Sequence, residues 1–241
     1  MPIRKLEARR GMKAATALLG LAAVCLSGCQ NIQNSNPAQT LVRVIDASYN
    51  APAIDVKIGA TPIAVNIGAA TFTNYAFLPP ENATADVYPT KTTTATASVA
   101  GAFLVGQQHS VFVTDTSGGY QATLLTDQAV NPPAGYVSLR FLQQAVQTGA
   151  VDIYLLPSNA TLAGAKPLLS DVATGTVSAY VNVQAESYTL VIAPAGDTNA
   201  KDVYTSEALQ FSGDQVRTVL IMDAQLTTSP PVTVTIGDDL N

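Results

Sequence analysis

The sequence predicts an all-β protein built from two tandem β-sandwich domains. Three observations carry this prediction. The chain is rich in Val, Thr and Ala, and only 12% of its residues are charged. Val and Thr suit the pleated, half-buried surface of a sheet. Short segments of alternating apolar and polar residues recur along the chain, and turn residues separate them at the spacing of a sandwich or barrel.

The first 28 residues stand apart from this pattern. Basic residues come first, an apolar run follows over residues 14–26, and Leu26, Ser27, Gly28 and Cys29 close the segment. A membrane-spanning helix needs about 20 apolar residues, so this shorter run instead predicts a secretory signal peptide. The four closing residues resemble the lipobox of bacterial lipoproteins. This resemblance implies cleavage before Cys29 and attachment of lipid, such as palmitate, to the Cys29 sulfur.

Residues 29–39 are mostly polar and predict a short, flexible tether between the lipid and the folded part. Gln30 follows the lipidated cysteine. In enteric bacteria, an Asp at this position retains lipoproteins at the inner membrane, so we expect export to the outer membrane of a Gram-negative bacterium. A start at Met12 instead of Met1 would also leave a complete signal peptide.

The charge of the mature chain narrows the range of partners. Five of the twelve basic residues lie in the signal peptide, but only one of the seventeen acidic residues does, so the mature chain carries a formal charge of −9. This balance argues against nucleic acid as a partner. We therefore expect the acyl chains alone to hold the protein at the membrane. With Cys25 removed and Cys29 lipidated, no disulfide remains to stabilise the fold.

The strands are predicted in order from their alternation. Apolar side chains alternate with polar ones over residues 111–113, 151–155, 188–192 and 232–236. Turn signals occur around Gly59 and at residues 117–119, 194–197 and 212–214. Two prolines within residues 131–134 interrupt the pattern, because proline removes backbone donors from a sheet. We therefore expect immunoglobulin-like sandwiches over residues 40–130 and 135–241, each able to fold alone.

The two predicted domains repeat a pair of charges. Arg43 and Asp55 are twelve residues apart, as are Arg140 and Asp152, and each Arg lies in an aliphatic run. A second register recurs further on: Tyr75, Glu81 and Pro89 match the spacing of Tyr180, Glu186 and Pro194. These repeats predict a duplication. We expect each Arg–Asp pair to form a bidentate bond between its first two strands, and the alternative is a ligand site that uses both charges.

Residues 41–56, LVRVIDASYNAPAIDV, resemble the opening of the bacterial domain-of-unknown-function family 4397. Asp46 stands where a His is usual in that family, and Tyr49 where a Pro is usual. The resemblance implies an exported or lipid-anchored protein with repeated β-rich domains. It implies no activity, since none is assigned to the family.

The residues that usually carry catalysis are scarce. His109 is the only histidine and begins a predicted strand, where we expect it to face solvent. A zinc site needs several nitrogen or sulfur ligands, and Ser–His–Asp catalysis would have to use His109. We therefore predict no enzyme activity and no cofactor. Weak calcium binding at residues 197–202 is the alternative, because oxygen ligands alternate there.

Carboxylates and tyrosines leave two further interpretations open. Paired carboxylates can hydrolyse glycans without histidine, but most acids here lie at predicted turns, where we expect a turn role: Asp115, Asp127, Asp197, Asp214 and Asp238. Four tyrosines are candidates for a surface that binds sugar or peptide: Tyr49, Tyr75, Tyr120 and Tyr180. The function predicted is a membrane-anchored binding or structural module of the cell envelope, with a glycan or an envelope protein as partner. The alternative is an envelope hydrolase.

Overall fold

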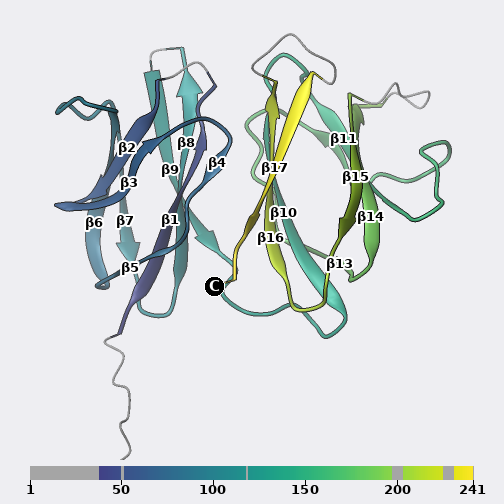
Figure 1. Cartoon of the computed structure of the whole chain (residues 1–241), viewed down its shortest axis with the longest axis horizontal. Helices are drawn as coiled ribbons and strands as arrows, with labels where there is room; N and C mark the ends of the chain where they lie inside the picture. Colours follow the sequence, from purple (N-terminus) through teal and green to yellow (C-terminus); the bar gives the residue numbers. More distant parts are fainter. Residues whose placement is uncertain (1–37, 50–51, 118, 197–202, 225–230, 241) are drawn as a thin grey trace, which may run out of the picture. The chain divides into compact units, whose positions relative to one another are not determined.

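The computed structural model describes residues 38–49, 52–117, 119–196, 203–224 and 231–240, in which the regular elements are all strands (Figure 1). The prediction of an all-β fold with β-sandwich architecture is therefore confirmed. The described residues contain no helix with the length and hydropathy needed to cross a membrane. The signal peptide, Cys29 and the calcium candidate at 197–202 lie outside the described residues.

The first half of the chain forms two sheets. In each half, we call the sheet that packs toward the other half the inner sheet, and the remaining sheet the outer sheet. The first inner sheet has the order β4-β1-β8-β9, with β5 also paired to β1, and the first outer sheet has the order β3-β2-β6-β7. Their bounds are β1 (Thr40–Ala47), β2 (Ile54–Ile58), β3 (Thr61–Ile67), β4 (Thr71–Phe72), β5 (Ala76–Leu78), β6 (Glu81–Pro89), β7 (Ala97–Phe103), β8 (Gln108–Thr116) and β9 (Gly119–Asp127).

The second half repeats this plan. Its inner sheet has the order β13-β10-β16-β17 and its outer sheet the order β12-β11-β14-β15. The bounds are β10 (Tyr136–Gln144), β11 (Val151–Pro157), β12 (Leu169–Val172), β13 (Val181–Gln184), β14 (Ser187–Pro194), β15 (Tyr204–Gln210), β16 (Val216–Asp223) and β17 (Val232–Asp238). β1 runs parallel to β8, and β10 runs parallel to β16 in the same way. The topology therefore repeats along with the sequence registers.

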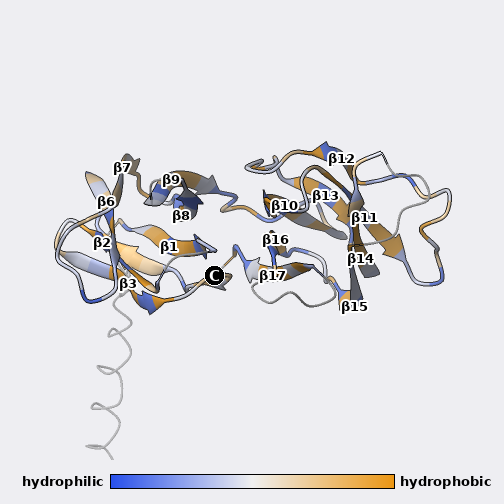
Figure 2. Ribbon diagram, turned by 90° about the horizontal axis from the view of Figure 1, so that it is seen from above, coloured by the Kyte–Doolittle hydropathy of each residue, from blue (hydrophilic) through white to orange (hydrophobic). Residues whose placement is uncertain are grey.

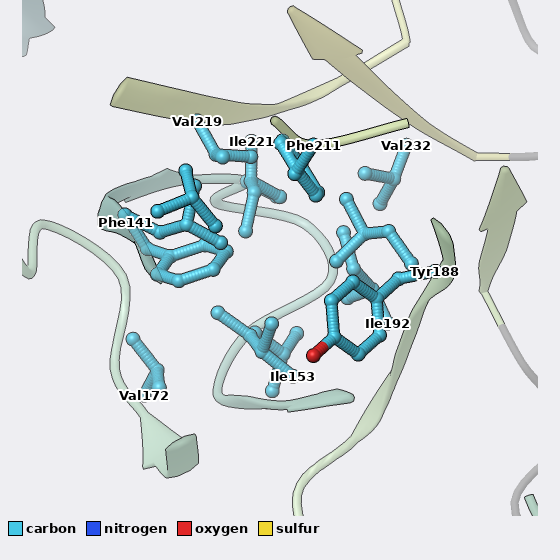
Figure 3. Packing of buried hydrophobic residues seen from close by; sticks show 14 residues of the cluster. Phe141, Ile153, Val172, Tyr188, Ile192, Phe211, Val219, Ile221 and Val232 are labelled. Carbon is cyan, nitrogen blue, oxygen red and sulfur yellow. The ribbon is translucent and has the colours of Figure 1, made fainter. Parts of the chain in front are cut away.

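Each half encloses its own apolar core between its inner and outer sheets. Val42 and Val44 of β1 face Ile54 and Val56 of β2 in the first core. The second core gathers Phe141, Ile153, Ile192 and their neighbours (Figure 3). Figure 2 shows the hydrophobic residues along strands such as β1 and β11. The alternation predicted for residues 151–155 and 232–236 thus places every second side chain in a core.

A third apolar cluster joins the two inner sheets. Ile45 of β1 and Phe112 of β8 pack with Leu142 of β10 and Leu220 of β16. These side chains alternate with core residues on the same strands, so they point out of their own sandwich and toward the other half. Residues 37–241 accordingly form one compact unit that contains both sandwiches.

Candidate functional site

Four charged side chains are buried where the inner sheets meet. Arg43 of β1 is 1% exposed and Arg140 of β10 is 3% exposed. Asp127 ends β9 and Asp239 follows β17, and both carboxylates are fully buried. Burying a charge is costly unless it is paired and hydrogen bonded, so the partners of these four groups determine what the site can do.

Each arginine pairs with the aspartate of the other half. Arg43 Nη2 lies 2.5 Å from Asp239 Oδ1, and Arg140 Nη2 lies 2.6 Å from Asp127 Oδ1. Longer contacts of 3.9 Å from Arg43 to Asp127 and 3.8 Å from Arg140 to Asp239 complete the set. Each arginine is therefore neutralised by a carboxylate from the other half, and the sum of the four charges is zero.

A hydroxyl group links each arginine to the aspartate of its own half. Ser110 Oγ accepts from Arg43 Nε at 2.8 Å and donates to Asp127 Oδ2 at 2.6 Å. Thr218 Oγ1 accepts from Arg140 Nε at 3.2 Å and donates to Asp239 Oδ2 at 2.5 Å. The hydroxyls thus use their donor and an acceptor position inside the network.

A tyrosine covers each arginine. The Tyr75 ring centroid lies 4.8 Å from the Arg43 guanidinium carbon, and the Tyr75 hydroxyl donates to Asp127 Oδ2 at 2.7 Å. Tyr180 lies 4.7 Å from that of Arg140 and donates to Asp239 Oδ2 at 2.6 Å. Burial and the nearby carboxylates raise the pKa of both phenols, so they remain donors. Burial alone would lower the Arg43 pKa, but Asp239, Tyr75 and Asp127 raise it above the ordinary value.

A cleft of about 400 Å³ opens beside Arg43, between segments of the two halves. It is lined by Arg43, Phe72, Thr73, Asn74, Tyr75, Ile236, Gly237, Asp238 and Leu240. Arg43 Nη1 donates to the Asp238 carbonyl at 2.7 Å in its wall. Gly237 is required there, because a Cβ at this position would lie 2.3 Å from the Phe72 ring. The cleft offers amide, hydroxyl and aromatic groups to a ligand.

The predicted Arg43–Asp55 pair is wrong. Asp55 instead accepts hydrogen bonds from the Asn66 backbone N–H at 2.7 Å and the Thr90 hydroxyl at 2.9 Å. The reason is topological. β1 belongs to the inner sheet and β2 to the outer sheet, and Arg43 and Asp55 both alternate with core residues, so they point out of opposite faces of the sandwich.

The predicted Arg140–Asp152 pair is wrong for the same reason. Asp152 on β11 of the second outer sheet accepts from the backbone N–H groups of Asp171 at 2.8 Å and Gly196 at 3.1 Å. The alternative of a ligand site built from both members of a pair fails with it. The repeated arginines were nevertheless the correct residues to single out, since both lie in the buried network.

Two further expectations are corrected. His109 does not face solvent: it is 3% exposed and packs edge-on against Phe103, with the ring centroids 5.5 Å apart. It shares its face of β8 with Val111 and Val113 of the first core. Asp127 does not serve a turn, because its carboxylate accepts from Arg140, Ser110 and Tyr75 within the network.

The four candidate tyrosines do not form one surface. Tyr75 and Tyr180 belong to the network, whereas Tyr49 donates to the Ala224 carbonyl at 2.9 Å and Tyr120 to the Pro52 carbonyl at 3.1 Å. Asp238, predicted at a turn, lies 3.5 Å from Arg217 in an exposed ion pair. In the described part of the chain, no three His, Cys, Asp or Glu side chains are grouped as metal ligands would be.

Asp46, which stands where a His is usual in the family, is a buried carboxyl whose burial the sequence did not reveal. It is fully buried, and its Oδ1 accepts from the Ser48 backbone N–H at 2.9 Å and from the Ser48 hydroxyl. Its Oδ2 has no hydrogen-bond partner among the described residues. Burial raises the pKa of Asp46, and the neighbouring Asp115 adds to this effect.

The fold and the network define a two-sandwich all-β protein with a charge exchange between its halves. Residues 40–154 match the model of the family described as "Domain of unknown function (DUF4397)", which confirms the resemblance predicted from residues 41–56. The match covers the whole first half and extends into β11.

No curated protein matches the chain. Among solved structures, the chain is similar to CBMbc, a family CBM26 module of Amy13K from Eubacterium rectale, in complex with maltoheptaose. That similarity covers 82% of this chain and 96% of the other at 8% identity, with a TM-score of 0.25. A similarity at this level does not bear on the ligand.

Proposed function

We propose that this protein is a non-catalytic binding or structural module, held at the cell envelope by lipid on Cys29 and by the tether of residues 29–39. The closed charge network carries the non-catalytic part of this proposal. Its arginines, aspartates and hydroxyls are bound to one another, so they join the two halves instead of offering a free acid, base or nucleophile.

The cleft beside Arg43 supports binding over hydrolysis. A glycosidase needs two carboxyl groups on either side of the scissile bond. Asp238 is the one carboxylate among the residues named as lining the cleft, and it lies 3.5 Å from Arg217. The uncharged donors and acceptors of Thr73 and Asn74, beside aromatic Phe72, suit a neutral, polyhydroxylated ligand such as a glycan.

The anchoring is tested by growing cells with labelled palmitate. We expect label in the wild-type protein and none in Cys29→Ala, with the wild type in the outer-membrane fraction. Cys25→Ala is the matched control and should be labelled like the wild type. Equal labelling of wild type and Cys29→Ala would reject the lipid anchor.

Binding is tested separately, by measuring retention of the purified protein on immobilised envelope glycans. Asn74→Ala should weaken retention without changing the melting temperature, since the Asn74 side chain is exposed in the cleft. Asn82→Ala, which changes an exposed asparagine on strand β6 of the outer sheet, is the control. Undiminished retention of Asn74→Ala would remove the cleft from the binding role.

A further inference from the structure

Three large apolar side chains are exposed around the point where the folded part begins. Phe77 is 62% exposed, Leu104 is 51% exposed and Val105 is 57% exposed. We refer to these three residues as the apolar rim. Single exposed apolar residues are ordinary, but a group of them at one place marks a contact with another surface.

Backbone pairing places the rim on both sides of the first residues of β1. On one side, Phe77 of β5 pairs with Leu41. On the other side lies the turn that holds Leu104 and Val105: the Gly106 N–H donates to the Gln39 carbonyl at 3.0 Å, and the Leu41 N–H donates to the Gln107 carbonyl at 3.1 Å. The rim therefore surrounds the residues that connect the fold to the tether.

The tether brings this end of the fold to the membrane. Nine residues separate Cys29 from Gln39. A fully extended chain spans at most about 3.6 Å per residue, so the lipidated end and Gln39 lie within about 36 Å of each other. A lipid surface is thus the apolar partner nearest to the rim whenever Cys29 is acylated.

Charge decides which lipids suit this contact. The mature chain has a formal charge of −9. Glu81 of β6 also lies opposite Phe103 of β7 in the strand register, next to Leu104. Anionic headgroups would repel this end of the protein. The contact must therefore come from burial of apolar side chains among zwitterionic headgroups.

We infer that the apolar rim inserts into the headgroup region of the membrane that carries the Cys29 lipid. This inference rests on the proposed lipid anchor and adds an orientation to it: the β1 start faces the lipid, and the opposite end of the inner sheets faces away. The cleft beside Arg43 would then lie in the half of the inner sheet nearer to the lipid.

The absence of tryptophan from the chain allows a clean test. Phe77→Trp introduces one fluorophore at the rim. Val146→Trp is the matched control, because Val146 is 71% exposed and lies beyond the other end of the inner sheets. Tyr49, after the end of β1, contacts Ala224, after the end of β16, and Asp223 binds Gln147. The two sites are therefore about one strand length, roughly 25 Å, apart.

Both lipidated variants are reconstituted into phosphatidylcholine vesicles with bromine on the acyl chains. We expect the Phe77→Trp emission to shift to shorter wavelength and to be quenched at least about twofold, because interfacial side chains reach the acyl boundary. Val146→Trp should keep the emission it has in buffer. If Phe77→Trp alters folding, Val105→Trp takes its place, and circular dichroism verifies the fold.

The outcomes separate this inference from the proposed function. Mass spectrometry first establishes whether Cys29 carries lipid, and an unmodified Cys29 would overturn both. If Cys29 is lipidated but the rim tryptophan is quenched no more than the Val146→Trp control, the anchor stands and the orientation is wrong. This holds whether both tryptophans are quenched or neither is, because the protein would then have no preferred face toward the lipid.

Discussion

The two halves of the molecule match closely at one end of their inner sheets and differ at the other. Near the starts of β1 and β10, each half supplies an arginine, a hydroxyl, an aspartate and a tyrosine with the same contacts. Near the ends of the same strands, Asp46 in one half occupies the place of Gln143 in the other, at the same 97-residue offset as the two arginines.

The difference lies in which hydrogen bonds are completed. Gln143 Oε1 accepts from the Ala145 N–H at 2.8 Å, and its Nε2 donates to the Gly149 carbonyl at 2.8 Å. Asp46 likewise accepts from the Ser48 N–H, but a carboxylate has no donor to match the Gln143 amide. The Pro52 carbonyl, which corresponds to that of Gly149, instead accepts a hydrogen bond from the Tyr120 hydroxyl. The groups of the charge network thus match between the halves, whereas the Asp46 and Gln143 positions differ in the hydrogen bonds they complete.

The largest expected effect comes from breaking the exchanged pairs. Arg43→Met leaves the Asp239 carboxylate buried without its arginine, and Arg140→Met does the same to Asp127. Each should cost about 3–5 kcal/mol of unfolding free energy, because a buried charge loses its partner. Urea unfolding of both variants measures this cost, and the symmetry of the network predicts equal losses.

A double-mutant cycle on Arg43→Met and Asp239→Leu sharpens this prediction. We expect strong coupling for that pair and coupling near zero for Arg43→Met with Asp55→Asn. Asp55→Asn alone should cost less than about 1 kcal/mol, since the amide keeps an acceptor for Asn66 and Thr90. Strong coupling to Asp55 would contradict the contacts described above.

Local features of this fold were predictable from the sequence. The alternation of residues 151–155 and 232–236 identified β11 and β17, and the turn signal at Gly59 marks the link between β2 and β3, where Gly59 has φ +56°. Both depend on residues near one another in the chain, because side-chain direction in a strand alternates residue by residue. The repeated Arg and Tyr positions likewise marked network members.

The pairing inside the network was not predictable in this way. Arg43 and Asp239 are 196 residues apart, and the twelve-residue spacing to Asp55 suited a hairpin that the chain does not make. The two aspartates also escaped the repeat, because Ser110 and Asp127 are 17 residues apart whereas Thr218 and Asp239 are 21 apart. Unequal connections between β8–β9 and β16–β17 hid a match that only the folded sheets reveal.

A reciprocal exchange at the differing end tests the second part of the comparison. Gln143→Glu replaces the donor to the Gly149 carbonyl by a carboxylate and should cost about 2–3 kcal/mol at neutral pH. Asp46→Asn should have the opposite sign and stabilise the protein by about 1 kcal/mol, because an amide removes a buried charge and keeps an acceptor for Ser48. Thermal unfolding at pH 7 measures both.

The pH dependence of Asp46 supplies a control for that exchange. Its pKa is raised above 3.8 in the folded protein, so its contribution to stability is complete below pH 3.8 and is lost as pH rises through the folded-state pKa. Asp46→Asn should remove this loss. An Asp46→Asn variant that is less stable than the wild type at neutral pH would show that the carboxylate has a partner of its own.

The two tyrosines test whether the network is as symmetrical in energy as it is in geometry. Tyr75→Phe removes one donor to Asp127, and Tyr180→Phe removes one donor to Asp239, while the ring over each arginine remains. Each should cost about 1.5 kcal/mol, typical of a hydrogen bond to a charged group. Chemical unfolding gives the two values, and a difference beyond about 1 kcal/mol would show that the halves share contacts but not their energetic weight.

The smallest expected effect concerns His109, whose counterpart in the second half is Arg217, partly exposed beside Asp238. Burial lowers the pKa of His109 despite the opposing influence of Asp127, and neither ring nitrogen has a partner of ordinary hydrogen-bond geometry among the described residues. The unfolded chain therefore binds a proton more readily than the folded one, and stability falls as pH drops below 6.5 toward the folded-state pKa. The loss is at most about 1.4 kcal/mol for each pH unit below 6.5.

Measured in an Asp46→Asn background, which removes the opposite trend of that carboxyl, the decline in stability between pH 6.5 and 5.5 should disappear in His109→Leu. An unchanged decline in that variant would assign the acid sensitivity to the carboxylates of the charge network instead.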